Sequence, residues 1–325
     1  MSDKKRTYLY GPVPSRRLGR SYGVDIIPFK VCTLDCVYCQ LGKTITKTTE
    51  RKDYVPIDAV LAELREALSE KVASDYITIA GSGEPTLHAQ LGRLIDGIKE
   101  LIHIPIALLT NGTLLYRPDV RADCVKADVV MPSLDAADDR TFQRINRPHP
   151  DINAKNAIFG LSELRKEYTG QIWLEIFFID DINTGEQQIH RIKEAIHRIR
   201  PDKIHLNTAV RPTAEPHIHR VDVTQLQSIA SYLGANCEVI ADIPKSQDET
   251  FSSEPKEMFE PHQITATKTS ALLSMLKRRP CSLNDICAGL GMAHNEALKH
   301  IHALQERGLI HTERKGERLF FKSSS

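Results

Sequence analysis

The 325-residue sequence lacks any run of 18 apolar residues, so no segment is long enough to cross a bilayer as a helix. It also lacks an apolar stretch near its start, because the charged residues 1–6 lead into Tyr10-Gly11-Pro12 and not into an apolar run. Neither a transmembrane span nor a secretory signal is predicted. We therefore expect a protein of the cytoplasm with no membrane partner.

An excess of charge of one sign is also missing, since 43 Lys and Arg stand against 42 Asp and Glu. Only the two ends are mildly basic. Residues 1–50 carry nine basic and four acidic side chains, and residues 263–325 carry ten and five. This distribution permits a nucleic-acid or phosphate partner but does not by itself indicate one.

Cysteine is too scarce and too unevenly placed for a disulfide framework. The chain has seven Cys, an odd number, and it is long enough to bury a core without covalent staples. Three of the seven lie within eight residues of one another. This clustering favours reduced thiols that are used for chemistry.

Short apolar runs that alternate with longer amphipathic segments are typical of repeated βα units. Most of the apolar runs have no polar face, which predicts buried parallel strands. Pro56 is placed to open one helix, and Ile189, Ile192, Ile196 and Ile199 form the apolar stripe of another. Six units predict an open doubly wound sheet or a partial barrel, and periodicity does not decide between them. The six predicted strands are residues 24–28, 76–80, 105–110, 128–132, 172–179 and 203–209.

The composition changes after residue 243. Residues 1–243 form the predicted α/β domain, and the polar, acidic residues 244–263 are predicted to be a linker. Residues 264–325 predict three helices, of which the second begins at a capping-box-like Ser282, followed by a short hairpin around Gly316. This order of elements predicts a small winged helix-turn-helix domain.

The most informative pattern is Cys32, Cys36 and Cys39, spaced C-x3-C-x2-C directly after the first predicted strand. Three thiolates on one loop can hold three corners of an iron-sulfur cluster and leave one iron open to a small molecule. A structural zinc site is the alternative. Zinc requires a fourth ligand, yet the next His and the next Cys are His88 and Cys124, far along the chain.

This cysteine spacing, with Tyr38 before the third Cys, resembles the signature of the radical S-adenosylmethionine (radical SAM) superfamily. The resemblance implies one [4Fe-4S] cluster on Cys32, Cys36 and Cys39, with S-adenosylmethionine bound at the open iron. It implies that an electron from a flavodoxin-type or ferredoxin-type donor cleaves this molecule to a 5'-deoxyadenosyl radical, which abstracts a substrate hydrogen. It also implies a partial (βα)6 barrel with its chemistry at the carboxyl ends of the strands.

The same resemblance gives roles to the ends of the later strands. Residues 81–85, Gly-Ser-Gly-Glu-Pro, are similar to the Gly-Gly-Glu-Pro motif that receives the amino group of S-adenosylmethionine, although a strand-to-helix turn is the alternative. Residues 110–112, Thr-Asn-Gly, resemble a segment near the ribose, and Asn-Gly is otherwise a common turn. Residues 133–135 offer ribose or carboxylate contacts, or helix caps. The implied cofactor-binding residues are Tyr38, Ser82, Gly83, Glu84, Thr110, Asn111, Ser133, Asp135 and Asn207.

Three further residues are candidates for a catalytic role. Glu175 interrupts the apolar run 172–178, and a buried carboxylate without a partner is costly, so we expect it to face the barrel lumen and bind a cation or hydroxyl there. Arg16 and Arg17 lie in a Pro- and Gly-rich segment and could bind a substrate phosphate or carboxylate at the barrel mouth. The alternative is a solvated basic loop that covers the bottom of the barrel.

Residues 10–25 together with the strand-end motifs are similar to prokaryotic Fe-S oxidoreductases related to wyosine-tRNA synthase, over about residues 8–262. This similarity implies an unidentified substrate that is a tRNA base or another nucleotide-linked molecule. Wyosine-forming enzymes carry additional Cys before the radical motif, whereas this chain has none before Cys32.

Two other hypotheses stay open at the level of sequence. An iron-sulfur redox sensor that binds DNA would use the winged helix, through Asn295, Lys299 or the basic hairpin residues, but it requires a more basic recognition helix. An activase would install a glycyl radical on a partner protein and would need no nucleic acid. The winged helix could equally dock a protein.

Overall fold

The computed structural model describes residues 6–69, 74–241, 266–316 and 318–324. Its largest element is an eight-stranded sheet with the order β1-β2-β5-β6-β7-β8-β9-β10. Strands β1 (Leu9–Ser15) and β2 (Gly19–Val24) are antiparallel, and every later pair of neighbours is parallel. The other strands are β5 (Tyr76–Ile79), β6 (Ile106–Thr110), β7 (Val129–Pro132), β8 (Gln171–Phe178), β9 (Lys203–Thr208) and β10 (Cys237–Val239).

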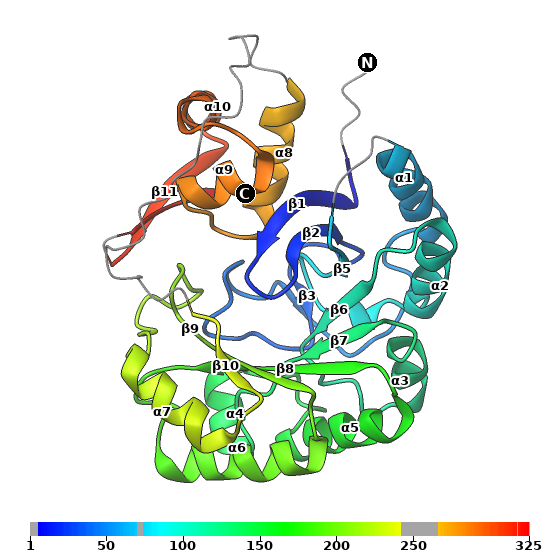
Figure 1. Ribbon diagram of the computed structural model, residues 1–325, viewed down its shortest axis with the longest axis vertical. Helices are drawn as coiled ribbons and strands as arrows, with labels where there is room; N and C mark the ends of the chain where they lie inside the picture. The colour runs from blue at the N-terminus through cyan, green and yellow to red at the C-terminus, as the bar shows by residue number, and fades with distance from the viewer. Residues whose placement is uncertain (1–5, 70–73, 242–265, 317, 325) are drawn as a thin grey trace.

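Helices connect the parallel strands and cover the outside of the curved sheet (Figure 1). The strand order follows the chain order, whereas a doubly wound sheet would reverse direction at a switch point. The prediction of six βα units in a partial barrel is therefore confirmed, and the open doubly wound alternative is wrong. The helices are α1 (Ile57–Ser69), η1 (Pro85–Leu87), α2 (Leu91–Leu101), α3 (Pro118–Cys124), α4 (Asp139–Ile145), α5 (Ala154–Glu167), α6 (Glu186–Ile199) and α7 (Val223–Leu233).

The prediction for the first strand was wrong. Residues 24–28 were expected to form it, but β2 ends at Val24 and the chain then leaves the sheet. Ile26 and Ile27 are buried by packing of the following loop, and their apolar character resembled that of a strand. Two strands of this sheet were missed, since β1 contains two prolines, which an edge strand tolerates, and β10 has only three residues.

Side chains along β8 alternate between two environments. Leu174 and Ile176 face outward into the main core beneath the helices. Trp173 faces inward and packs with Leu18 and residues of β6 and β7 at the base of the barrel. Because the side-chain period of a strand is two, Glu175 also faces inward, above this apolar base.

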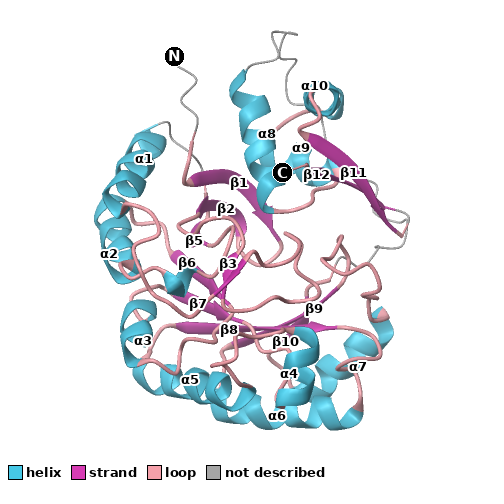
Figure 2. Ribbon diagram, turned by 180° about the vertical axis from the view of Figure 1, so that it is seen from behind, coloured by secondary structure: helices cyan, strands magenta, loops and turns pink. Residues whose placement is uncertain are grey.

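Residues 266–324 form a C-terminal unit of three helices and a hairpin beside β1 (Figure 2). This is the element order expected of a winged helix, and the assignment to that class stays a prediction. The linker predicted at 244–263 lies outside the described residues. The elements are α8 (Ala266–Arg278), α9 (Leu283–Leu290), α10 (His294–Glu306), β11 (Ile310–Lys315) and β12 (Arg318–Ser323).

The C-terminal unit contacts the barrel at both ends of the open sheet. At the β1 edge, Val13 is part of the apolar core of the unit. Arg278 donates to Asp25 at 3.0 Å, just beyond β2. On the other side, beyond β9, Lys315 Nζ donates to the carbonyl oxygen of Ile218 at 2.8 Å. The unit therefore packs both on the β1 edge of the sheet and on the segment that follows β9.

None of the helices in the described part of the chain is long and apolar enough to cross a membrane. The cytoplasmic location stays a prediction.

We expect Gly160→Ala to destabilise the protein because a Cβ on this residue of α5 would overlap backbone atoms of Leu115 and Tyr116. Overpacking of this kind costs about 1–3 kcal/mol. Gly185→Ala is the matched control, since a Cβ there meets no atom within 4 Å. Thermal unfolding followed by circular dichroism should show a lower midpoint for Gly160→Ala only, and equal midpoints would contradict the packing described.

Candidate active site

The loop that carries the three cysteines leaves the sheet after β2 and is tied to the barrel by backbone bonds. Its base is a short parallel pair, β3 (Val31–Cys32) with β4 (Thr46–Lys47). Its middle docks on the end of α4, where Asp35 N donates to the Asn146 carbonyl at 2.9 Å and Val37 N donates to that of Ile145. These bonds give the loop a defined shape without any metal.

Each thiol of the loop accepts a hydrogen bond from a nitrogen of a different residue. Lys30 Nζ lies 3.1 Å from Cys39 Sγ. Asn111 Nδ2, just after β6, lies 3.5 Å from Cys32 Sγ, and Asn146 Nδ2 lies 3.4 Å from Cys36 Sγ. Donors of this kind orient cysteine ligands and offset the negative charge that they carry when they bind metal.

Burial, and then the nearby Glu84, raises the pKa of Cys32 to about 12. Burial and then Asp135 likewise raise the pKa of Cys36 well above its usual value. Without metal, these thiols therefore hold their protons, and metal binding must displace them.

A single metal ion does not suit this arrangement. Across the described ranges of the chain, no three His, Cys, Asp or Glu side chains lie close enough together to hold one ion. Zinc requires ligands about 2.0–2.3 Å from a shared centre. The described residues thus give no support to the zinc alternative, while three partly buried thiols that each accept from a different nitrogen suit a larger iron-sulfur cluster.

The loop after β5 holds a buried carboxylate, Glu84, beside the cysteine loop. Its oxygens accept bonds from Thr86 N at 3.1 Å, Thr110 Oγ1 at 2.5 Å and Asn111 N at 2.7 Å. Burial raises the pKa of Glu84 despite these bonds. An ammonium group at this site would be an additional donor to a carboxylate that is already held in place.

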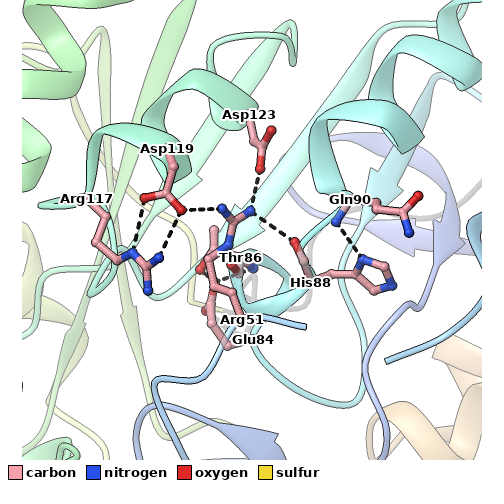
Figure 3. Close-up of polar contacts among 8 residues, drawn as sticks. All are labelled: Arg51, Glu84, Thr86, His88, Gln90, Arg117, Asp119 and Asp123. Atoms are coloured by element: carbon pink, nitrogen blue, oxygen red, sulfur yellow. Dashed lines mark hydrogen bonds and ion pairs between the residues drawn. The ribbon is translucent and has the colours of Figure 1, made fainter. Parts of the chain in front are cut away.

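Figure 3 shows the side chain that anchors this loop, Arg51. Its guanidinium donates to the carbonyl oxygens of Thr86 at 3.0 Å and His88 at 3.1 Å. The same group pairs with Asp119 at 2.7 Å and with Asp123, both on α3. Sequence reasoning missed Arg51, because nothing in its neighbourhood distinguishes it from a solvated basic residue.

Two positions in the predicted Gly-Ser-Gly-Glu-Pro motif require their particular residues. A Cβ at Gly83 would overlap the carbonyl oxygen of Val31, so only glycine fits beneath the cysteine loop. Ser82 replaces a glycine of the family motif. Its backbone N and its hydroxyl both donate to Asp25, at 3.0 and 2.6 Å, so this residue links the motif to the end of β2.

Asp135, after β7, gathers three donors at the other side of the cysteine loop. It accepts bonds from Tyr38 Oη at 2.6 Å, Asn146 Nδ2 at 2.7 Å and Phe177 N at 2.8 Å. Burial raises the pKa of Asp135 to about 6. Tyr38 also stacks on Phe177 with 4.0 Å between the ring centroids, which fixes its position beside Cys39.

A second polar group lies in the barrel lumen. Glu175 pairs with Arg17 and accepts a bond from Asn207 Nδ2 at 3.0 Å. Burial raises the pKa of Glu175, but Arg17 and Asn207 outweigh it and hold that pKa below its usual value. Sequence reasoning missed His205, which lies two residues before Asn207 on β9. Burial, and then Arg17, lowers its pKa to about 4, so it is neutral at pH 7.

The structure brings most of the sequence-predicted residues into these two groups. Ser133 lies between them through a β-bridge with Glu175. Arg16 is separate, since it is exposed and donates to the carbonyl oxygen of Ile240 just beyond β10. The first group holds Cys32, Cys36, Cys39, Tyr38, Ser82, Gly83, Glu84, Thr110, Asn111 and Asp135, and the second holds Arg17, Glu175 and Asn207.

We expect Glu175→Gln to lower the free energy of unfolding at pH 7 by about 2 kcal/mol, because it leaves Arg17 without its charged acceptor. The pKa of Glu175 is lower in the folded protein than in the unfolded chain, where the pKa of a Glu is about 4.3. Its carboxylate therefore stabilises the protein at pH values above about 4.3, and this contribution is lost as the pH falls through the folded-state pKa. The difference between wild type and variant, measured by urea unfolding, should therefore persist down to about pH 4 and shrink below it. The exposed Glu100→Gln is the control, and a difference that is constant with pH would contradict this account.

Comparisons with known proteins agree with this geometry. A family model described as the radical SAM superfamily matches residues 26–198, just over half of the chain. A UPF0026 protein of Synechocystis sp. is 36% identical over 205 residues, which are 63% of this chain and 76% of that protein. The crystal structure of Streptococcus suis SuiB shares the fold, with a TM-score of 0.50, 18% identity, and coverage of 68% of this chain and 49% of that one.

A protein called GTPase Obg, of Brachyspira hyodysenteriae, is 35% identical over 312 residues, which are 96% of this chain. This chain spans only 44% of that relative's length. The present sequence contains no G-x-x-x-x-G-K-[S/T] phosphate loop, so that relative's name assigns no GTPase site here. The family match, the UPF0026 relative and the partial barrel with its three-cysteine loop together show that this chain belongs to the radical SAM superfamily of enzymes.

Proposed function

We propose that the chain binds one [4Fe-4S] cluster through Cys32, Cys36 and Cys39, binds S-adenosylmethionine beside it, and abstracts a hydrogen atom from a substrate. Bound together, these two groups supply a 5'-deoxyadenosyl radical. The observation that carries the proposal is the set of three partly buried thiols, each of which accepts a hydrogen bond from a different residue, Lys30, Asn111 or Asn146. An external donor of the flavodoxin or ferredoxin type is the proposed source of electrons.

The residues of the chain prepare the site in two ways. Lys30, Asn111 and Asn146 aim N–H groups at the thiols and offset the charge of the thiolates. Glu84 and Asp135, each with at least three donors, hold the ends of β5 and β7 rigidly on either side of the cysteine loop. A site that is already arranged loses little free energy to reorganisation during reaction.

We propose that S-adenosylmethionine lies across the strand ends that these groups define. The backbone around Gly83 and the carboxylate of Glu84 would receive its amino group. Asn207 and Ser133 would contact the remainder from β9 and β7. The full proposed set is Tyr38, Ser82, Gly83, Glu84, Thr110, Asn111, Ser133, Asp135 and Asn207.

The C-terminal unit offers little support for a DNA-binding regulator. Helix α10, which would be the recognition helix, contains Lys299 as its only Lys or Arg and also carries Glu296 and Glu306. Lys315, one of the basic hairpin residues that this hypothesis would use, is bonded to the carbonyl of Ile218 on the barrel. A backbone-binding surface for DNA requires several basic residues that are open to phosphate.

We expect 5'-deoxyadenosine to form when the anaerobically reconstituted protein receives dithionite and S-adenosylmethionine. Cys36→Ala removes one of the three thiols and should abolish product formation. Cys237→Ala, on the edge strand β10, should retain it and controls for the loss of a thiol in general. Product measured by liquid chromatography at equal levels in both variants would reject the proposed ligand set.

Lys30→Met should shift the reduction potential of the reconstituted cluster to more negative values. The ammonium of Lys30 lies 3.1 Å from Cys39 Sγ and is buried, so it favours the more negative, reduced state. Lys30→Arg keeps the charge and should give a potential closer to that of the wild type. The exposed Lys43→Met, on the same loop, is the control. A redox titration followed by electron paramagnetic resonance measures the shift, and an unchanged or more positive potential for Lys30→Met would count against the contact.

A further inference from the structure

A cavity of about 420 Å³ lies between the barrel and the C-terminal unit. Its walls come from the β1–β2 hairpin, from strands β5, β6, β8 and β9, and from helices α8 and α9. It reaches Gln40, which directly follows Cys39, and Gly81, which opens the loop of Glu84. A molecule in this cavity would thus lie beside the cysteine loop, at a size suited to a small substrate.

The lining of the cavity is strongly basic. Five arginines face two carboxylates, which leaves a net charge of +3. Asp25 lies behind one of these arginines and lowers the balance to +2. Positive charge in a partly enclosed space is less screened than charge on an open surface, so the cavity favours an anion. The arginines are Arg16, Arg17, Arg211, Arg278 and Arg279.

Arg211 has donor capacity that its protein partner does not use. Its residue surface is 7% exposed, and its Nε has no hydrogen-bond partner in the described part of the chain. Its Nη2 reaches the two oxygens of Asp285 only at 3.4 Å. Asp285 is in turn engaged at the start of α9, where it accepts from Ser282 N at 3.0 Å. A buried guanidinium with an unsatisfied N–H is costly unless a ligand supplies the acceptor.

The inner end of the cavity is different, since its charges are matched. Arg17 pairs there with Glu175, and Asn207 donates to the same carboxylate. The N–H of Arg211 that has no acceptor among the described residues lies at the other end, where Arg211 meets Asp285 of α9. An anionic group held at that end would leave the rest of the molecule directed toward the lumen and the cysteine loop.

We propose that this cavity is the substrate pocket and that it takes a small molecule with a phosphate or carboxylate group, which Arg211 and Arg279 bind. Arginine is suited to both anions because its planar fork donates two parallel hydrogen bonds. The C-terminal unit is then a wall of the active site. This inference rests on the proposed function and names the substrate class of the same site.

The test is calorimetric titration of the full-length protein, without cluster or S-adenosylmethionine, with inorganic phosphate in one arm and succinate in the other. We expect at least one anion to bind at millimolar concentration, and the arm that binds identifies the group. Arg211→Gln should weaken binding about tenfold or more, since a hydrogen bond to a charged group contributes about 1.5–3 kcal/mol. Arg211→Lys keeps the charge and should lose less.

Arg279→Gln, just beyond α8, is a second variant in case Arg211→Gln does not fold, and it should weaken binding as well. Arg198→Gln, exposed on the far side of α6, should bind like the wild type. No binding of either anion, or equal binding by the Arg211 and Arg279 variants and the wild type, would overturn the proposal.

The outcome is separable from that of the proposed function. If neither anion binds but 5'-deoxyadenosine forms in the reconstituted protein, the anion pocket is wrong and the radical function stands. If an anion binds in the arginine-dependent way but no 5'-deoxyadenosine forms, the proposed function fails, and with it the assignment of the pocket to a radical substrate.

Discussion

Thiols that become anionic on binding metal are partly buried in this protein, and an anion away from bulk water is stable only where donors surround it. Lys30 supplies one donor from the cysteine loop itself, and Asn111 and Asn146 supply two more from segments far along the chain. They meet because the parallel strands of the barrel all end at one edge, which brings the loops after β2, β6 and β7 together. The geometry of the cysteine loop is thus a consequence of the sheet.

The need of an anion for nearby donors also explains the arrangement of Glu175 in the barrel lumen. Glu175 lies on the inward side of β8, and its partner Arg17 lies on the turn of the N-terminal hairpin. Leu18, the next residue, fills the apolar base below them with Trp173. One turn therefore closes the base of the barrel and neutralises its buried carboxylate.

A partial barrel leaves a gap between its edge strands, and here the C-terminal unit covers it. Arg278 reaches Asp25 at one edge and Lys315 reaches the carbonyl of Ile218 at the other. This arrangement joins two regions that the sequence presents as separate domains. It also explains why arginines of the C-terminal unit line a cavity beside the cysteine loop.

Several features of the fold and of the candidate site can be predicted from the sequence alone. The six βα units, the C-x3-C-x2-C spacing and the isolated Glu175 are local patterns, and local patterns follow from strand and helix periodicity or from spacing along one loop. Lys30, Arg51, Asn146 and Arg278 show no such pattern, and Val24 was placed in the wrong part of its strand. Their contacts join residues up to hundreds of positions apart, as between Asp25 and Arg278, and only the closure of the sheet and the docking of the C-terminal unit bring such partners within hydrogen-bond distance.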